Sequence, residues 1–234
     1  MMSIPGNSLG AIIAVVSAVS AMVVACKVLE EELRILAPQG FEFRFLEQGF
    51  HRWPQRLRLA LQEALAGVSE DGPVRLGYGY CGGALEGLAS PPGGLVIPKA
   101  DDCISLLLGS REARLSWGSD TYFLSAGWLC GEGNLVQEYR QCLGRYGREK
   151  GRRLMRRGFS RYRRLVFIAT GRLGEEGARE AAAEVAQELG LDFEVTGWQD
   201  GFLRRLLFGP WDREFLCLEP GTQVSLAGLL AERV

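Results

Sequence analysis

Short apolar runs alternate along the chain with segments whose leucines and alanines recur at helical spacing. The apolar runs predict β-strands at residues 23–26, 42–46, 74–77, 95–97, 121–124, 165–169, 193–196 and 215–218. Helices are predicted at residues 27–33, at 57–65 behind Pro54, and at 175–189, where Gly190 closes an Ala- and Glu-rich segment. Because strands and helices alternate, we expect an α/β fold with a mostly parallel sheet flanked by helices.

Length and composition agree with a globular protein. The chain has 234 residues, of which 47% are hydrophobic and 24% charged, and its formal net charge is -1. These values exclude a disordered tail, and 6 cysteines without a C-x-x-C pair exclude a disulfide scaffold. We expect one α/β domain over residues 22–234, built either as a single unit or as two Rossmann-like lobes that meet near residues 125–165.

The N-terminal 26 residues carry no charge and allow two interpretations. Their length approaches that of a membrane span, and residues 23–26 resemble a lipoprotein cleavage box. However, the segment before the apolar run lacks the Lys or Arg that a secretory signal normally carries. We therefore expect residues 21–25 to form a buried first strand, Met22 to be the natural start, and residues 1–21 to be an extension. On this interpretation the protein is cytoplasmic, and it meets a membrane only if residues 1–26 are an anchor.

Residues 145–164 are strongly basic. They hold ten of the 27 Lys and Arg residues but only one of the 28 acidic residues, so the rest of the chain is acidic. A solvated helix face is the simplest explanation, and an anionic cofactor or an acidic partner is the alternative. No RNA-binding, helix-turn-helix or zinc-finger motif accompanies the segment, so we do not expect nucleic acid as a partner.

Four residues with metal-binding side chains follow the first four predicted strands. Cys26, His51, Cys81 and Cys103 each lie near the carboxyl end of a strand. Such loops share one edge of a parallel sheet, so these residues are expected to converge on one site. Because His51 is the single histidine, sites that need several imidazoles are excluded.

The loops around Cys81 and Cys103 carry further candidates. Gly79, Gly82 and Gly83 allow close approach of a ligand, and their amides would stabilise a thiolate; a tight turn with an inert cysteine is the alternative. Asp101 and Asp102 stand beside Cys103, where two carboxylates favour a bound metal. Alternatively, Asp102 caps the following helix and Asp101 is solvated.

Small residues followed by tryptophan end two later strands, at residues 125–128 and 195–198. Gly171 follows another strand. Such turns can hold an anion through backbone amides, and Trp128 and Trp198 can form the wall of a planar cofactor site or simply seal the core. Cys130, Cys142 and Cys217 have no matching context and are expected to be packing thiols.

The motifs resemble a domain-of-unknown-function family of anaerobic archaea and bacteria. They are A-C-x-x-L-x-x-E-L at residues 25–33, G-F-H-x-x-P at 49–54, L-G-Y-G-x-C-G at 76–82, L-V-I-P-K-A-x-D-C-I-x-L-L-L-G-S at 95–110 and T-Y-x-L-x-x-G-W at 121–128. The resemblance implies a role in corrinoid or one-carbon metabolism, because family members are often encoded near corrinoid-dependent methyltransferases. The chain departs from the family at Asp101, where members commonly have His, and at Leu129-Cys130, where they tend to have Ile-Glu.

Together these features predict a metal-binding protein of anaerobic one-carbon metabolism. Cys26, Cys81 and Cys103 would hold an iron–sulfur cluster or zinc, with His51 or Asp101 as the fourth ligand. The anaerobic setting implied by the resemblance favours iron–sulfur. Two alternatives remain: a non-catalytic accessory protein that binds a corrinoid, a corrinoid protein or a methyltransferase, and an enzyme with Cys81 as nucleophile and His51 as base.

Overall fold

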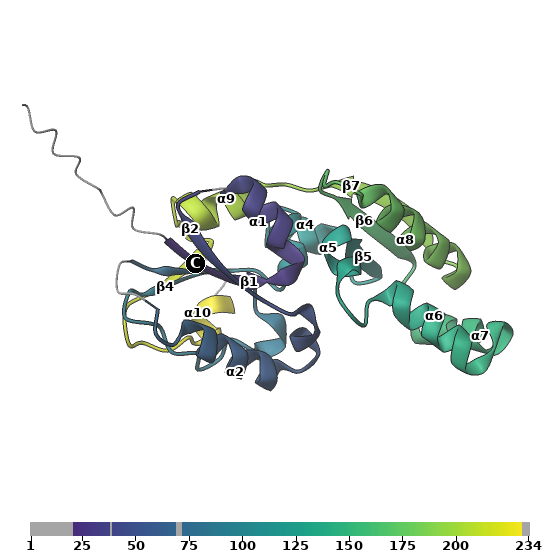
Figure 1. The fold of residues 1–234 in the computed structure, drawn as a ribbon, viewed down its shortest axis with the longest axis horizontal. Helices are drawn as coiled ribbons and strands as arrows, with labels where there is room; N and C mark the ends of the chain where they lie inside the picture. The colour runs from purple at the N-terminus through teal and green to yellow at the C-terminus, as the bar shows by residue number, and fades with distance from the viewer. Residues whose placement is uncertain (1–20, 38, 69–71, 231–234) are drawn as a thin grey trace, which may run out of the picture.

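The structure is a computed structural model that describes residues 21–37, 39–68 and 72–230 (Figure 1). Residues 1–20, on which the expected extension and the alternative of an anchor rest, lie outside these ranges. The described chain forms two β-sheets, each flanked by helices, so the predicted α/β class is confirmed. Within these residues, no helix has the length and apolar character needed to cross a membrane.

The first lobe is built on a five-stranded sheet with the order β2-β1-β3-β4-β8. Strands β1 to β4 are parallel, and β8 pairs with β4 in the antiparallel direction. Burial on both faces explains why the central strand β1 reads as a continuous apolar run. The strands are β1 (Ala21–Cys26), β2 (Phe41–Leu46), β3 (Val74–Gly77), β4 (Leu95–Pro98) and β8 (Phe215–Leu218).

Helices cover both faces of this sheet, with α1 and α9 on one side and α2 and α10 on the other (Figure 1). Leu57, Leu61 and Leu65 form the buried stripe of α2, at the spacing that predicted the helix. The helical elements of this lobe are η1 (Lys27–Leu29), α1 (Glu30–Leu36), η2 (Gln48–Arg52), α2 (Pro54–Leu65), η3 (Cys81–Gly83), α3 (Cys103–Leu107), α4 (Arg111–Ser116), α9 (Gly201–Phe208) and α10 (Leu226–Leu230).

The second lobe is built on a parallel three-stranded sheet with the order β5-β6-β7. Its elements are β5 (Thr121–Ser125), α5 (Ala126–Cys130), α6 (Leu135–Tyr146), α7 (Arg148–Gly158), β6 (Arg164–Ala169), α8 (Glu175–Leu189) and β7 (Asp192–Gly197). Helices α6 and α7 form a hairpin at the end of the molecule farthest from the first lobe (Figure 1). After β7 the chain returns to the first lobe. There α9 packs against the first sheet, and β8 adds its last strand.

The two lobes share a hydrophobic core. The larger cluster of buried residues belongs mainly to the first lobe but includes Phe123, Val166 and Ile168 of the second. Gly127 in α5 lies so close to η1 that a Cβ atom there would stand 2.1 Å from the carbonyl oxygen of Val28. The carboxyl end of β5 therefore packs against the carboxyl end of β1, and the strand ends of the two sheets face each other.

Each predicted strand is present, with ends that differ by no more than two residues. The helix predicted at residues 27–33 begins as the short η1 and continues as α1 to Leu36. Gly190 closes α8 in the left-handed conformation, as the sequence indicated.

Candidate functional site

Three cysteines lie at the carboxyl edge of the first sheet. Cys26 is the last residue of β1, Cys81 is in η3 after β3, and Cys103 opens α3 after β4. These strands are neighbours in the sheet order, which explains why the three loops meet. Cys26 and Cys103 are buried, and Cys81 is half-buried. We call these residues, together with the buried Tyr78, the thiol cluster.

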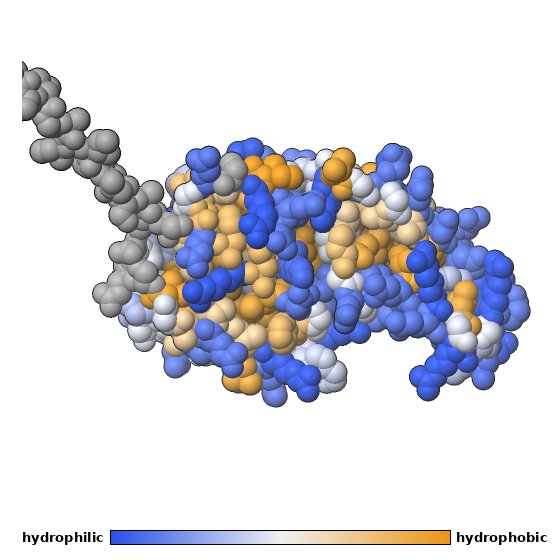
Figure 2. Space-filling view, viewed as in Figure 1, coloured by the Kyte–Doolittle hydropathy of each residue, from blue (hydrophilic) through white to orange (hydrophobic). Residues whose placement is uncertain are grey.

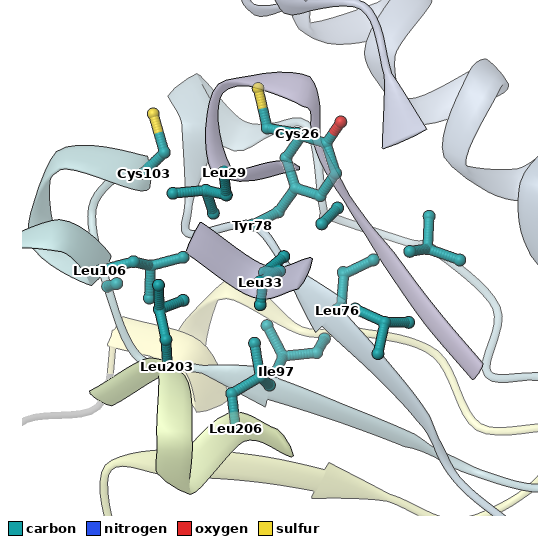
Figure 3. Close-up of a cluster of buried hydrophobic side chains, with 14 of the residues drawn as sticks. Cys26, Leu29, Leu33, Leu76, Tyr78, Ile97, Cys103, Leu106, Leu203 and Leu206 are labelled. Atoms are coloured by element: carbon teal, nitrogen blue, oxygen red, sulfur yellow. The ribbon is translucent and has the colours of Figure 1, made fainter. Parts of the chain in front are cut away.

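Figure 3 shows the polar atoms of Cys26, Tyr78 and Cys103 on one side of a set of buried leucines. The sulfur atoms of Cys26 and Cys103 and the hydroxyl of Tyr78 all point away from Leu33 and Leu106. The hydroxyl of Tyr78 is buried and has no hydrogen-bond partner of normal geometry among the described residues. It lies beside the thiol of Cys26, with which it interacts electrostatically. A buried hydroxyl without a full partner is unusual and is consistent with a binding site.

Backbone contacts fix the loop of Cys81 against the loop of Cys103. The amide of Tyr80 donates to the carbonyl oxygen of Ala100 at 2.7 Å, and the amide of Cys81 donates to that of Asp101 at 2.9 Å. A Cβ atom at Gly79 would stand 2.5 Å from the carbonyl oxygen of Ala100. Glycine at position 79 thus allows close approach, as expected, but the approaching group is the protein's own backbone.

Cys81 has an unusual backbone conformation. Its φ of 44° lies in the left-handed region, which no other non-glycine residue in the described part of the chain adopts. Gly82 and Gly83 follow with φ of 67° and 90°. Residues held in this region carry strain of about 1–3 kcal/mol and concentrate at functional sites.

Electrostatics distinguish the thiols of the pair Cys26 and Cys103. The neighbouring Cys103 thiol lowers the pKa of Cys26, and the backbone amide of Val28 adds to this against the opposing effect of burial. The same interaction, together with burial, raises the pKa of Cys103 well above its usual value. Cys26 is therefore the more acidic thiol of the pair.

The remaining groups of the cluster stay protonated at neutral pH. Burial raises the pKa of Cys81 to about 12, and the charges of Cys26 and Asp102 contribute. Burial also raises the pKa of Tyr78 well above its usual value. Cys81 is consequently a poor nucleophile in this environment, which argues against the alternative in which Cys81 attacks a substrate.

The carboxylate next to the cluster is Asp102. Its Oδ1 accepts a hydrogen bond from the amide of Ser105 at 3.1 Å, so Asp102 caps α3 as one interpretation of the sequence expected. Burial raises the pKa of Asp102, whose charge acts on both Cys81 and Cys103. Asp101, the predicted ligand, turns towards Arg111 instead, with 3.0 Å between its Oδ1 and the Arg111 Nε.

His51 lies apart from the thiols, on the exposed side of η2. Its Nδ1 contacts the carbonyl oxygen of Gln48, and its ring packs edge-on against Trp128 with 4.8 Å between centroids. Strand β2 is the edge strand of the sheet, and His51 follows it by five residues, so the loop carries the imidazole to the boundary with the second lobe. As the side chains stand, no group of three or more His, Cys, Asp or Glu residues in the described ranges has the arrangement of a metal site.

In the turns of the second lobe that were predicted to bind an anion or a planar cofactor, the protein's own groups make the contacts. The amides of Thr170 and Gly171 donate to the carboxylate of Glu175 at 2.7 Å and 3.0 Å, which takes the place expected for an anion. Trp198 donates its amide to Ala169 and packs against the main core. Trp128 packs against both cores, and its buried indole nitrogen has no hydrogen-bond partner among the described residues.

Two pockets lie between the lobes. The larger, of about 670 Å³, is lined by charged groups that already pair with one another, including Lys27 with Glu47 at 2.5 Å and Arg172 with Glu31. The smaller, of about 440 Å³, is lined by both Asp102 and His51. We call it the His51 pocket; its other lining residues are Ile104, Arg114, Ser119, Thr121, Tyr122, Phe123, Trp128, Arg161 and Tyr162.

The basic segment forms α7 and the turn that leads into β6. Arg148 and Arg152 each approach a carboxylate oxygen of Glu188 in α8 at 3.3 Å, so part of the positive charge holds the helices of the second lobe together. Gly151 and Met155 face the second core, whereas Arg153, Arg156 and Arg157 of α7 are exposed, and Figure 2 shows a largely hydrophilic surface over α6 and α7.

The fold and the site define a two-lobed α/β protein with a buried thiol cluster at the edge of its larger sheet. A family model described as "Protein of unknown function (DUF1638)" matches residues 45–207. The protein belongs to this family, and the expected resemblance to a domain-of-unknown-function family is confirmed. No curated protein and no solved structure matches the chain. The corrinoid and one-carbon setting that the resemblance implied stays a prediction.

Proposed function

We propose that the protein binds a thiophilic metal, as zinc or an iron–sulfur cluster, through Cys26, Cys81 and Cys103. The observation that carries the proposal is that Cys26, Cys81 and Cys103 lie in loops at the carboxyl ends of three neighbouring strands, near enough for their charges to act on one another. Sulfur ligands of this kind suit zinc and iron–sulfur centres. Three protein thiolates leave a fourth position for Asp102, an external ligand or substrate.

The chemistry of the cluster supports this proposal. The pKa of Cys26 is lowered, whereas burial keeps the protons on Cys81 and Cys103. A bound cation would offset the desolvation of these thiolates and displace their protons. Since no three ligands stand in a metal arrangement among the described residues, binding includes rotation of the thiols. Gly82 and Gly83 next to Cys81 give that loop the freedom to adjust.

Loading the reduced protein with metal tests the proposal. Under argon, the wild-type chain is titrated with Zn²⁺ against a chromophoric chelator, and in parallel it is reconstituted with Fe²⁺ and sulfide. We expect about one equivalent of zinc or one cluster per chain, and loss of at least tenfold in affinity for Cys26→Ser and Cys103→Ser. Cys217→Ser, which removes an exposed thiol in β8 outside the cluster, is the matched control and should bind as the wild type does. Failure of both metals to bind, or equal loss in the control, would contradict the proposal.

The proximity of Cys26 and Cys103, whose pKa values shift in opposite directions, favours a second candidate, a redox-active dithiol. In this reaction the Cys26 thiolate attacks a substrate disulfide and releases one thiol. Cys103, after losing its proton, then attacks the mixed disulfide and releases the second thiol, leaving a Cys26–Cys103 disulfide. Incubation with oxidised glutathione followed by thiol counting tests this candidate: two thiols should disappear from the wild type, and no such internal pair should form in Cys103→Ser.

For the setting, we propose the cytoplasm, because free thiols persist in reducing compartments. The corrinoid protein or methyltransferase expected as a partner remains a proposal from the resemblance. Co-purification of the chain with such a partner would support it, and a partner that binds equally well after Cys26→Ser would indicate a role independent of the thiols.

A further inference from the structure

We infer that the His51 pocket is a binding site for a small, flat organic anion, and that Arg114 and Arg161 hold its phosphate or carboxylate group. This goes beyond the proposed metal function and requires no metal at the thiols. The pocket has about 440 Å³ of space, which is within the range of small-molecule sites.

Two arginines line the pocket. Within the described ranges, neither Arg114 nor Arg161 makes an ion pair at salt-bridge distance, although the charge of Arg114 acts on the nearby carboxylate of Asp102. Arg114 lies 4.5 Å from the ring centroid of Phe123, and Arg161 donates to the hydroxyl of Tyr162 at 2.6 Å. Both guanidinium groups are thus held by aromatic residues, which leaves N–H donors for an oxyanion.

Aromatic rings form further walls. Tyr122, Trp128 and Tyr162 line the pocket, and Tyr122 contacts Tyr162 edge-on with 5.2 Å between centroids. Flat rings of this kind bind planar groups by stacking or edge contacts. The combination of flat walls and unpaired guanidinium groups matches a ligand with an aromatic or conjugated body and an anionic end.

Both lobes contribute to the pocket. His51, Asp102 and Arg114 belong to the first lobe, and Arg161 and the tyrosines belong to the second. A ligand in the pocket would therefore contact both lobes. Because Asp102 stands directly before Cys103, the ligand would also lie beside the thiol cluster.

Binding of 1-naphthyl phosphate tests the inference, because this probe combines a flat ring with an oxyanion. Titration of wild-type protein is followed by tryptophan fluorescence, and Trp128→Phe identifies the indole that responds. The parallel probes are 1-naphthoate, which distinguishes a carboxylate from a phosphate, and 1-naphthol, which lacks the anion. We expect saturable binding of one or both anions and binding at least tenfold weaker for 1-naphthol.

Arg114→Gln and Arg161→Gln should each weaken anion binding at least tenfold. Arg153→Gln, on the exposed side of α7, is the matched control and should leave binding unchanged. Should an arginine variant fail to fold, Arg114→Lys keeps the charge but loses the forked donors and should show an intermediate loss. No binding of either anion at millimolar concentration, equal binding of 1-naphthol, or equal loss in Arg153→Gln would overturn the inference. Metal content is measured on the same samples, so failure of the metal proposal is seen separately.

Discussion

The thiols of Cys26 and Cys103 are neighbours at the carboxyl edge of the first sheet, and Cys103 is the largest influence on the pKa of Cys26, which it lowers. The two residues come from the end of β1 and the start of α3, and the parallel sheet brings them together. The resulting pair has one thiol with a lowered pKa and one with a raised pKa. This asymmetry leads to a direct test of the geometry.

Cys103→Ala should make Cys26 less reactive. Without the Cys103 thiol beside it, the pKa of Cys26 rises, and the fraction of thiolate at neutral pH falls. We expect alkylation of Cys26 by iodoacetamide at pH 7 to slow several-fold, with the midpoint of its pH profile moved upward. The profile is measured by mass spectrometry of the peptide that contains Cys26, with exposed Cys130 as an internal reference. An unchanged midpoint would show that Cys103 does not set the reactivity of Cys26.

Gly79→Ala should destabilise the fold, because the new methyl group would meet the backbone of Ala100 and Asp102 at 2.5–2.8 Å. A backbone cannot move aside as a flexible side chain does, so we expect a loss of about 1–3 kcal/mol in the free energy of unfolding. Gly144→Ala is the matched control: it lies in α6 with open space around the new atom and should be neutral or more stable by up to about 1 kcal/mol. Urea denaturation measures both, and equal effects would refute the proposed role of Gly79.

Gly127→Ala should disturb the contact between the lobes. A Cβ atom there would stand 2.1 Å from the Val28 carbonyl oxygen, so α5 and η1 must separate to accommodate it. We expect a loss of about 1–3 kcal/mol in stability and faster hydrogen exchange at the start of α1. Hydrogen exchange followed by mass spectrometry locates the change, and protection unchanged at α1 would contradict this packing of the lobes.

Glu32 should make stability fall as pH rises. Its side chain is only 1% exposed and its carboxylate oxygens have no hydrogen bond of normal geometry among the described residues; burial raises its pKa above the usual 4.5. The folded state therefore holds this proton more tightly than the unfolded state does. The contribution is fully present below about pH 4.5 and is lost as pH increases through the raised pKa.

Glu32→Gln removes this titration. The difference in free energy of unfolding between the wild type and Glu32→Gln should shift in favour of the variant as pH rises above 4.5. Urea denaturation at a series of pH values measures it. Parallel curves for the two proteins would mean that Glu32 titrates alike in the folded and unfolded states.

The strands could be predicted because burial on both faces imposes long apolar runs on β1 and β6. The alternation of these runs with segments of helical spacing predicted the α/β class. The meeting of Cys26, Cys81 and Cys103 followed from topology, since β1, β3 and β4 are neighbours in a parallel sheet. These features depend on the course of the backbone and are therefore visible in the sequence.

The details of the site could not be predicted because they depend on where individual side chains turn. Asp101 and Asp102 are adjacent, yet capping of α3 turns Asp102 towards the thiols while Asp101 meets Arg111. The sequence suggested that the Gly171 amide could bind an external anion, but in the structure it donates to the carboxylate of Glu175 in α8. Tyr78 was present in the motif, but its buried hydroxyl becomes significant only when the surrounding thiols are placed.

The metal and sulfide content of the protein as purified without oxygen tests the central claim most directly. The wild type, each serine variant of Cys26, Cys81 and Cys103, and the Cys217→Ser control are compared by elemental analysis, sulfide assay and visible absorption. We expect zinc, or iron with acid-labile sulfide, at about one centre per chain in the wild type and the control. Each cluster variant should show a clear loss. A wild-type protein that carries neither metal and takes up neither on reconstitution would contradict the claim and leave the dithiol pair of Cys26 and Cys103 as the function of the cluster.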